Sequence, residues 1–216
     1  MIYGSGLVAT AMAPMFPSPE IVVYAAGVSN SGCTDTTEFL RERERLMRAL
    51  EAHVQADRVI YFSTCSILDD AAQESMYVRH KLAMESLVRR HARHVILRLP
   101  QVAGRTPNPH TLLNFLQARI ARSEKFEIWK FSTRNILDID DIAMLVSYLV
   151  LNEGAVGETI NVANPVSTPI REIVAEMEKI VGKRAVFEVQ AAGSSYAIDG
   201  TRIQEAKKLL IQQAAA

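Results

Sequence analysis

The chain contains few residues of the kinds that build disulfide-stapled or metal-binding proteins. It has two cysteines, Cys33 and Cys65, and neither belongs to a CxxC motif or to a cluster of cysteine and histidine. Two isolated thiols provide no disulfide framework and no zinc site, so a reducing compartment such as the cytoplasm is expected. The five histidines show no ligand spacing, and we expect no metal site.

Long hydrophobic runs and an excess of one charge are also missing. The longest apolar stretch, residues 142–151, is about half as long as the roughly 20 residues that a membrane-spanning helix needs. The N-terminus lacks the charged segment of a signal peptide, so we expect none. Lys and Arg total 24, as do Asp and Glu, and bulk charge therefore indicates neither a nucleic acid nor an anionic membrane as partner.

What the chain does contain is an alternation of predicted strands and helices over 216 residues, enough for a sizeable core. Strands are predicted at residues 1–3, 21–25, 58–63 and 94–97, and those at 21–25 and 58–63 read as buried. A first helix is predicted to end at about residue 16, and further helices are predicted at 37–54 and 75–91. Later helices are predicted at 111–122, 139–151, 170–181 and 201–210, and short strands at 126–130, 136–137, 158–161 and 187–189. This order predicts an α/β fold, a Rossmann-like doubly wound parallel sheet with a small C-terminal lobe.

A glycine-containing turn follows the first predicted strand. Gly4, Gly6 and Ala9 give the pattern Gly-x-Gly-x-x-Ala, immediately before the first predicted helix. A dinucleotide-binding turn requires this setting, because the glycines let the backbone approach a pyrophosphate near the start of a helix. The motif alone is weak evidence, since any tight strand-to-helix turn can contain it.

Tyr77 and Lys81 are four residues apart in a predicted helix and therefore share a face. A phenol has a pKa of about 10, and a nearby ammonium lowers it. A hydroxyl such as that of Thr64, at a predicted strand end, could orient a substrate oxygen beside the phenol. This set would move a proton on and off an alcohol oxygen, and a nicotinamide cofactor is implied because no side chain supplies a hydride. The alternative is a tyrosine and a lysine on a solvated helix surface.

In their shared order, these motifs resemble the extended short-chain dehydrogenases/reductases, specifically the NAD-dependent epimerase/dehydratase family that acts on nucleotide sugars. The resemblance runs along nearly the whole chain, through segments 4–9, 22–27, 62–64, 77–81, 97–104, 134–143 and 157–163. It implies hydride transfer to or from a sugar carbinol, with NAD or NADP as cofactor, in polysaccharide biosynthesis. It also implies a homodimer through helices 37–54 and 75–91, with apolar surface from Phe39, Met47, Leu82 and Leu87. The alternative is that these four residues face only the sheet.

The resemblance assigns roles to individual residues. Tyr77 would be the general acid/base, and Lys81 would lower its pKa and hold the nicotinamide ribose. Thr64 would orient the reacting sugar oxygen, with Ser63 as the alternative; otherwise Thr64 only caps the strand end. The expected cofactor-binding residues are Gly4, Ser5, Gly6, Leu7, Val8, Ala25, Ala26, Gly27, Lys81, Pro100 and Val102.

Two further residues are expected to bind substrate together with Thr64. They are Asn108 and Arg134, whose planar guanidinium suits the oxygens of a diphosphate. The alternative for Arg134 is a surface position. No carboxylate follows Thr64, where Cys65 and Ser66 stand, and this favours an epimerase or ketoreductase over a dehydratase.

The chain departs from the family pattern in its cofactor-binding half. Tyr3 stands where the first glycine of the family turn would be, and only residues 14–20 separate the first helix from the next strand. One βαβ unit is therefore missing, with the acidic residue that would bind the adenosine ribose. The sequence does not distinguish NAD from NADP.

The sequence leaves three functions open. They are a nucleotide-sugar oxidoreductase or epimerase, a relative that has lost its cofactor and serves as a binding or assembly module, and a reductase of a small carbonyl substrate. The expected division places residues 1–105 and 134–155 in a truncated dinucleotide-binding core. Residues 106–133 and 156–216 form the expected substrate lobe.

Overall fold

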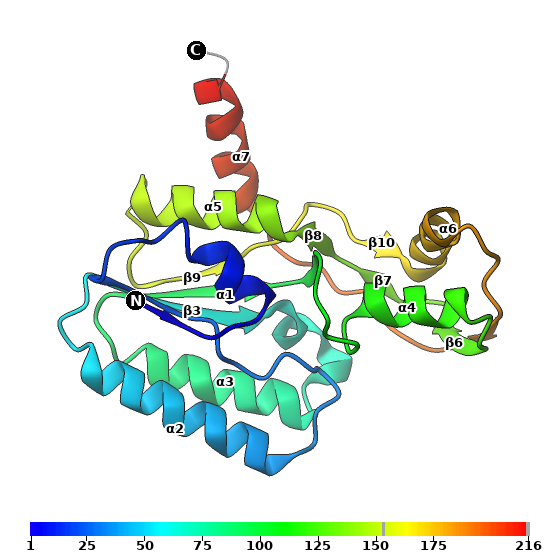
Figure 1. Ribbon diagram of the computed structural model, residues 1–216, viewed down its shortest axis with the longest axis horizontal. Helices are drawn as coiled ribbons and strands as arrows, with labels where there is room; N and C mark the ends of the chain where they lie inside the picture. Colours follow the sequence, from blue (N-terminus) through cyan, green and yellow to red (C-terminus); the bar gives the residue numbers. More distant parts are fainter. Residues whose placement is uncertain (153, 215–216) are drawn as a thin grey trace.

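Residues 1–152 and 154–214, which the computed structural model describes, contain a central five-stranded parallel sheet (Figure 1). The spatial order of its strands is β1–β2–β3–β4–β9, and every neighbouring pair is parallel. The strands are β1 (Ile2–Tyr3), β2 (Ile21–Tyr24), β3 (Arg58–Thr64), β4 (His94–Leu99) and β9 (Glu158–Asn161). The α/β class and the Rossmann-like sheet predicted from the sequence are confirmed.

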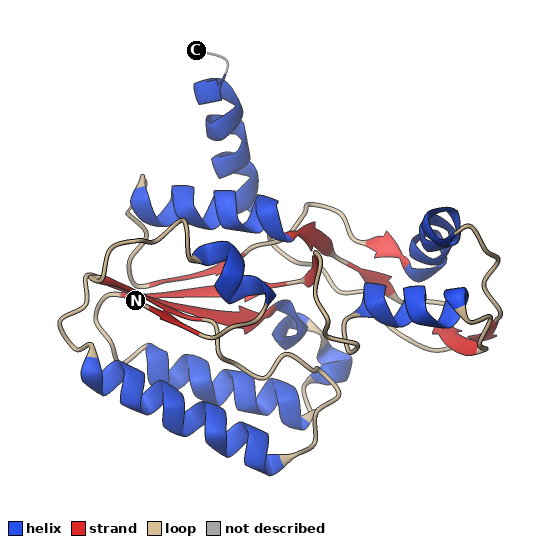
Figure 2. Ribbon diagram, viewed as in Figure 1, coloured by secondary structure: helices blue, strands red, loops and turns tan. Residues whose placement is uncertain are grey.

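Continuous burial explains why these segments form strands. Every residue of β2 is buried, and so is every residue of β3 after Arg58. Val, Ile, Tyr and Phe favour extended backbone; they make up all of β2 and the middle of β3. Because helices cover both faces of the sheet (Figure 2), the strands carry unbroken apolar runs instead of an alternating pattern.

The helices form one layer on each face of the sheet (Figure 1). On one face lie α1 (Leu7–Met12) and α5 (Ile139–Leu151), with α7 (Thr201–Ala214) packed against α5. On the other lie α2 (Thr36–Ala52) and α3 (Met76–Val88). The helix α1 ends at Met12, four residues earlier than predicted. No helix in the described part of the chain is long and apolar enough to cross a lipid bilayer.

Local capping fixes where the two helices that flank the site begin. The Asp35 carboxylate accepts a hydrogen bond from the Thr37 amide at 2.8 Å, and Ser75 Oγ accepts one from the Val78 amide at 3.1 Å. Both contacts satisfy amides that the first turn of a helix leaves free. The Ser75 cap places Tyr77 in the first turn of α3, beside the end of β3.

A smaller lobe lies beyond the carboxyl ends of the strands (Figure 1). Its helices are α4 (Leu112–Ala121) and α6 (Ile170–Val181). It also has two pairs of short strands: β6 (Phe126–Trp129) with β11 (Phe187–Gln190), and β7 (Thr133–Arg134) with β10 (Thr168–Pro169). Leu116, Ile120 and Ile173 belong to its own apolar core. The lobe is therefore a separate small layer of helices and strands beside the site.

Four short elements connect the sheet to the lobe and to α3. The pair β5 (Gln101–Ala103) and β8 (Ile136–Asp138) is parallel and leads from β4 toward the lobe. Two 3₁₀ helices, η1 (Cys65–Leu68) and η2 (Asp70–Ala72), join β3 to α3. No sequence pattern predicts β5 or either 3₁₀ helix, because such short elements have no periodicity.

The chain is divided differently from the expected arrangement in one respect. The sequence predicts that residues 156–216 belong as a whole to the lobe. In the structure β9 pairs with β4 as the fifth strand of the central sheet, and α7 packs on α5. The chain thus returns from the lobe to the sheet twice, because the apolar edge of β4 and the outer side of α5 must both be covered.

At the opposite edge of the sheet, β1 pairs only with β2. Residues 13–20 join α1 directly to β2, and eight residues cannot hold a further strand, helix and strand. In the described residues, therefore, no strand covers the outer edge of β1. This arrangement agrees with the βαβ unit that the sequence lacks.

Candidate functional site

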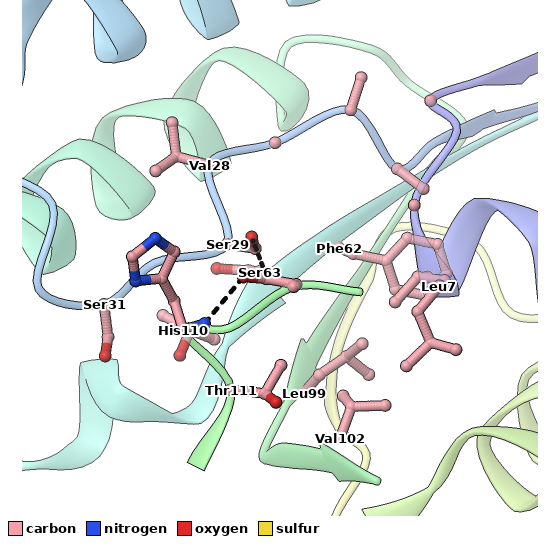
Figure 3. A pocket seen from close by; sticks show the side chains of 18 of the residues that line it. Leu7, Val28, Ser29, Ser31, Phe62, Ser63, Leu99, Val102, His110 and Thr111 are labelled. Carbon is pink, nitrogen blue, oxygen red and sulfur yellow. Dashed lines mark hydrogen bonds between the residues drawn. The ribbon is translucent and has the colours of Figure 1, made fainter. Parts of the chain in front are cut away.

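A cavity of about 440 Å³ lies at the carboxyl ends of the parallel strands (Figure 3). This is the edge where ligands bind in open α/β sheets. Figure 3 shows Leu7, Phe62 and Val102 toward one end of the cavity and Ser31 and His110 toward the other. Of the predicted site residues, the structure brings all but Arg134 into the lining: Gly4, Ser5, Gly6, Leu7, Val8, Ala25, Ala26, Gly27, Ser63, Thr64, Tyr77, Lys81, Pro100, Val102 and Asn108.

The glycine turn has a backbone that other residues would strain. Gly4 has a φ of +125°, and a Cβ at this position would lie 2.4 Å from the carbonyl oxygen of Ala25. The turn therefore packs directly on the end of β2, which only glycine permits. At Gly6 a Cβ would meet no atom within 4 Å, so the backbone there faces open space. A ligand can approach the main chain closely at Gly6.

The Tyr77 and Lys81 side chains both reach the cavity from α3 and are almost fully buried, at 7% and 2% exposure. Lys81 Nζ lies 5.8 Å from the centre of the Tyr77 ring. The ammonium donates to Glu42 Oε1 at 3.0 Å and to the Tyr61 hydroxyl at 3.3 Å. The predicted pair is therefore together, and its cation is held by a carboxylate from α2.

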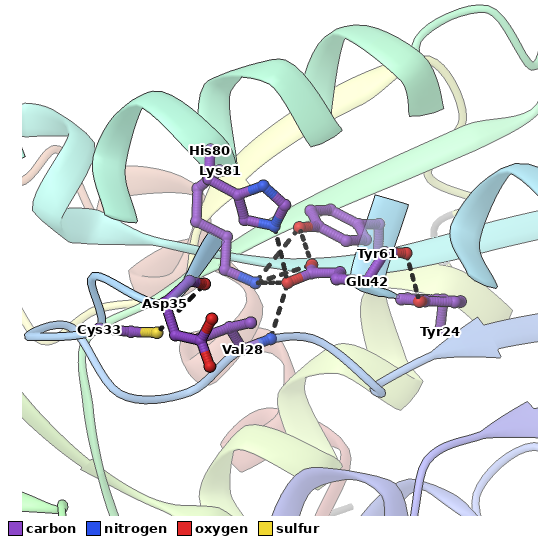
Figure 4. A network of polar contacts seen from close by, with 8 residues as sticks. All are labelled: Tyr24, Val28, Cys33, Asp35, Glu42, Tyr61, His80 and Lys81. Atoms are coloured by element: carbon purple, nitrogen blue, oxygen red, sulfur yellow. Dashed lines mark hydrogen bonds and ion pairs between the residues drawn. The ribbon is translucent and has the colours of Figure 1, made fainter. Parts of the chain in front are cut away.

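Glu42 is the centre of a polar network that no sequence motif predicts (Figure 4). Besides Lys81, its carboxylate accepts hydrogen bonds from the Tyr61 hydroxyl at 2.8 Å and from the Val28 amide at 2.7 Å. His80 Nε2 lies 2.9 Å from Oε2. The network ties α2, α3, β3 and the loop after β2 together beneath the cavity.

Glu42 is charged although it is only 2% exposed. Burial raises the pKa of this carboxyl, but the His80 hydrogen bond, the Lys81 charge and the Val28 amide outweigh burial and hold the pKa at about 2. The sequence carried one signal of this arrangement. Glu42 lies between Phe39 and Leu46 on the apolar stripe of α2, and an acidic residue on a buried stripe needs a partner.

The loop after β2 packs closely against this network. A Cβ at Gly27 would lie 2.6 Å from Lys81 Nζ and 2.8 Å from Glu42 Oε1. Burial raises the pKa of the Tyr61 hydroxyl well above its ordinary value, and Glu42 adds to the effect. Tyr61 is therefore a neutral hydrogen-bond donor that orients Glu42.

Thr64 and Ser63 end β3 at the cavity. Thr64 Oγ1 accepts a hydrogen bond from the Ser66 amide at 3.1 Å and lies 3.1 Å from Ser66 Oγ. The hydroxyl thus caps η1, directly after the strand, and Thr64 also lines the cavity. Ser63 is buried and lines the cavity beside it.

A second buried ion pair anchors α3 to the sheet. Arg98 of β4 donates two hydrogen bonds of 2.8 Å to the two oxygens of Glu85. Burial raises the pKa of Glu85, but the bidentate contact with Arg98 outweighs it and lowers the pKa overall. Because Glu85 follows Lys81 by one helical turn, this contact fixes the position of the helix that carries Tyr77 and Lys81.

The two predicted substrate residues lie in different places. The Asn108 side chain lines the cavity and donates to Ser29 Oγ at 3.2 Å, which joins the segment before α4 to the loop after β2. Arg134 is on β7 in the lobe, does not line the cavity and donates to the neighbouring Thr133 carbonyl at 2.8 Å. The structure therefore does not bring Arg134 to the other site residues.

The lobe also contacts the segment after β3. Ser194 Oγ donates to Asp69 Oδ1 at 3.0 Å, a contact between residues 125 positions apart. Burial raises the pKa of the nearby Tyr196 phenol, as do Cys65 and Asp69, whereas Arg134 lowers it. The Tyr196 phenol is therefore close enough to this segment to be influenced by its charges, and no sequence pattern predicted its position.

The charges that line the cavity are of one sign. The described lining residues include the cations Lys81 and Arg45 and the imidazole of His110, but no Asp or Glu. The carboxylate nearest to Lys81 is that of Glu42, which lies behind Lys81 in the network. Such a lining suits a ligand that carries phosphate groups.

Comparisons with known proteins agree with this geometry. Residues 4–163 match the model of the NAD dependent epimerase/dehydratase family. No curated protein matches the chain closely enough to show a relationship.

Similar solved structures include RMD from Pseudomonas aeruginosa complexed with NADPH, at 19% identity and a TM-score of 0.71, covering 95% of this chain and 81% of that one. MoeE5 in complex with UDP-glucose and NAD has 20% identity and a TM-score of 0.70; the match covers 86% of this chain and 72% of that one. UDP-glucose 4-epimerase of Thermus thermophilus, in complex with NAD, has 14% identity and a TM-score of 0.69; the match covers 94% of this chain and 77% of that one. At these identities the likeness shows the fold.

Proposed function

Because the chain belongs to the NAD-dependent epimerase/dehydratase family, we propose that it is an NAD(P)-dependent oxidoreductase or epimerase that acts on a nucleotide sugar. The observation that carries this proposal is the meeting of Tyr77, Lys81 and Thr64 with the glycine turn in one cavity. These residues come from three different elements, the turn after β1, the end of β3 and the start of α3, and each has a use in the interconversion of an alcohol and a ketone. The absence of Asp and Glu from the described lining supports a diphosphate-bearing ligand.

The residues present fit a dinucleotide. The open space at Gly6 admits a pyrophosphate to the backbone, and the buried Lys81 ammonium is a donor for ribose hydroxyls. Ala25, Ala26 and Gly27 form the adjoining wall. When bound, the nicotinamide would accept or return the hydride of a sugar carbon.

The chain itself would handle the proton. In its ionised form the Tyr77 phenol takes the proton of the sugar hydroxyl as the carbon is oxidised, and the neutral phenol returns it on reduction. Thr64 would orient the reacting oxygen through a hydrogen bond. Lys81 stays fixed because Glu42 and Tyr61 hold its ammonium in place. The lack of a carboxylate directly after Thr64 supports an epimerase or ketoreductase, with no acid placed there for removal of water.

The test is to mix the purified protein with oxidised NAD or NADP and a panel of nucleoside-diphosphate sugars. We expect reduced nicotinamide to appear, or the sugar to epimerise, which absorbance and NMR of the product would detect. Saturable dinucleotide binding with no turnover of any sugar, together with no competition by UDP or dTDP, would instead favour a small carbonyl substrate.

One observation favours a second function. β1 has no strand on its outer edge within the described residues, so the adenosine half of a dinucleotide lacks part of its usual support. A module that binds a partner without a cofactor is the alternative. Equilibrium dialysis against NAD(H) and NADP(H) decides between them, because a module of this kind would bind neither.

We extend the proposal to a homodimer through α2 and α3. Phe39 is buried within the chain, where its ring stacks on His80 at 4.6 Å, so it offers little surface to a partner. Met47 is exposed, and Leu82 and Leu87 are half-buried. Light scattering at micromolar protein should give twice the monomer mass, and a monomeric mass would rule out this part of the proposal.

A further inference from the structure

A second hollow, of about 560 Å³, adjoins the cavity at the open edge of the sheet. Both are lined by Gly4, Ser5, Ala26 and Arg45, so the two hollows meet at the glycine turn. The second one continues away from Tyr77 and Lys81. Its position is where the half of a dinucleotide beyond the pyrophosphate would extend.

The missing βαβ unit explains why this hollow exists. β1 has no outer neighbour in the described residues, so Tyr3 is only half-buried at the edge. The Tyr3 ring stacks on Tyr24 with centres 5.9 Å apart, and its hydroxyl lies 2.9 Å from His53 Nε2. Ala49 and Ala52 of α2 line the hollow with small side chains. The result is an aromatic floor with open space above it.

Two arginines of α2 border this floor. Arg45 and Arg48 are three residues apart and therefore neighbours on the helix surface. Both are exposed, and neither makes a hydrogen bond or ion pair with any described residue. Two neighbouring cations without a carboxylate partner repel each other, so an anion bound between them is favourable.

The two hollows together contain no Asp or Glu among the described lining residues. A carboxylate is the usual partner for the free adenosine ribose hydroxyls of NAD, whereas arginine accommodates the 2′-phosphate of NADP. A guanidinium can also form two parallel hydrogen bonds with phosphate oxygens. The charges at this edge therefore match the phosphorylated cofactor.

We propose that Arg45 and Arg48 bind the 2′-phosphate of NADP(H), so that the chain selects NADP(H) over NAD(H). The inference rests on the proposed function, because it concerns the same cofactor. Discrimination between NADP(H) and NAD(H) then depends on α2 and the uncovered edge of β1, because this chain lacks the strand whose acidic residue would bind the adenosine ribose. Arg45 and Arg48 act as specificity residues and have no part in the proton transfer at Tyr77.

The test is a fluorescence titration of NADPH and NADH with the wild type, with Arg45→Gln/Arg48→Gln and with Arg43→Gln, at one fixed ionic strength. Arg43 is the matched control, since it is an exposed arginine of α2 that lines neither hollow. We expect the wild type to bind NADPH at least about tenfold more tightly than NADH, the ratio that one charged hydrogen-bond pair provides. The double variant should lose that ratio, because its NADPH affinity falls much more than its NADH affinity, and Arg43→Gln should keep both affinities.

The outcomes separate this inference from the proposed function. If wild type binds neither dinucleotide, the proposed function fails, and the inference fails with it. If both bind equally, or if the double variant keeps the NADPH preference, the arginine assignment is wrong while the proposed function stands. An equal loss in Arg43→Gln would show a general charge effect and would also overturn the assignment. Circular dichroism of each variant checks that it is folded.

Discussion

The two ends of the cavity are built in opposite ways. At the Tyr77 end, α2, α3 and β3 are joined by buried hydrogen bonds to one carboxylate, Glu42, so that Lys81 has little freedom. At the glycine-turn end, the sheet stops at β1 and exposed arginines border an open hollow. A chain that lacks one βαβ unit can therefore hold its reacting groups in fixed positions, although no strand covers the glycine-turn end of its ligand site.

The largest effect is expected for Tyr77→Phe. Removal of the phenol hydroxyl takes away the only proposed proton acceptor, and turnover should fall by about 10²- to 10⁴-fold, the usual contribution of a general acid/base. Stability should change little. Tyr148→Phe, in α5 on the other face of the sheet, is the control and should retain turnover. Unchanged turnover in Tyr77→Phe would remove the proton-transfer assignment.

Glu42→Gln should weaken the rigid end of the site. The variant leaves the Lys81 ammonium buried without its carboxylate, which costs about 3–5 kcal/mol for a buried ion pair. Urea unfolding measures this loss. Glu38→Gln, on the exposed side of the same helix, should shift stability by no more than about 0.5 kcal/mol. Equal effects of the two substitutions would contradict the role of the network.

The same carboxylate should make stability depend on pH. The pKa of Glu42 is about 2 in the folded chain and 4.5 ordinarily, so ionisation stabilises the fold above about pH 4.5. That contribution, of about 3 kcal/mol, is lost as the pH falls from 4.5 to 2, because the unfolded chain binds the proton first. The unfolding free energies of wild type and Glu42→Gln should therefore converge across this window. A constant difference down to about pH 2 would contradict the assignment.

Two glycine substitutions should separate folding from binding at the open end. Gly4→Ala should destabilise the fold by about 1–3 kcal/mol, because alanine is strained at a φ of +125° and its Cβ would meet Ala25. Gly6 has extended backbone and free space, so Gly6→Ala should fold normally. Its methyl group should nevertheless weaken dinucleotide binding, which equilibrium dialysis measures. Loss of stability in Gly6→Ala, or unchanged binding, would contradict the proposed approach of a ligand there.

Much of the rigid end could be predicted because its signals are local. The four-residue spacing of Tyr77 and Lys81 places them on one face of a helix, and the apolar run of β3 ends at Thr64. Parallel strands bring their carboxyl ends to one edge, so these residues meet whatever the details of packing. The same reasoning predicted the glycine turn, and the resemblance named most of the residues that line the cavity beside it.

Other features depend on contacts between distant segments, which no local pattern contains. Glu42 accepts a hydrogen bond from Lys81, which is 39 positions away in the sequence. The pKa of the Glu42 carboxyl in the folded chain depends on its burial and on the contact with His80. The return of β9 and α7 to the core, and the position of Arg134 away from the cavity, follow from how the lobe packs.

By itself, the sequence determined the parallel α/β sheet, the glycine turn and the shared helix face of Tyr77 and Lys81, because hydrophobic runs and helical spacing act over a few residues. Only the tertiary structure decided which carboxylate holds Lys81, which arginines border the open edge, and which segments cover the sheet. The physical reason is that burial and charge pairing exist only after distant segments have packed together.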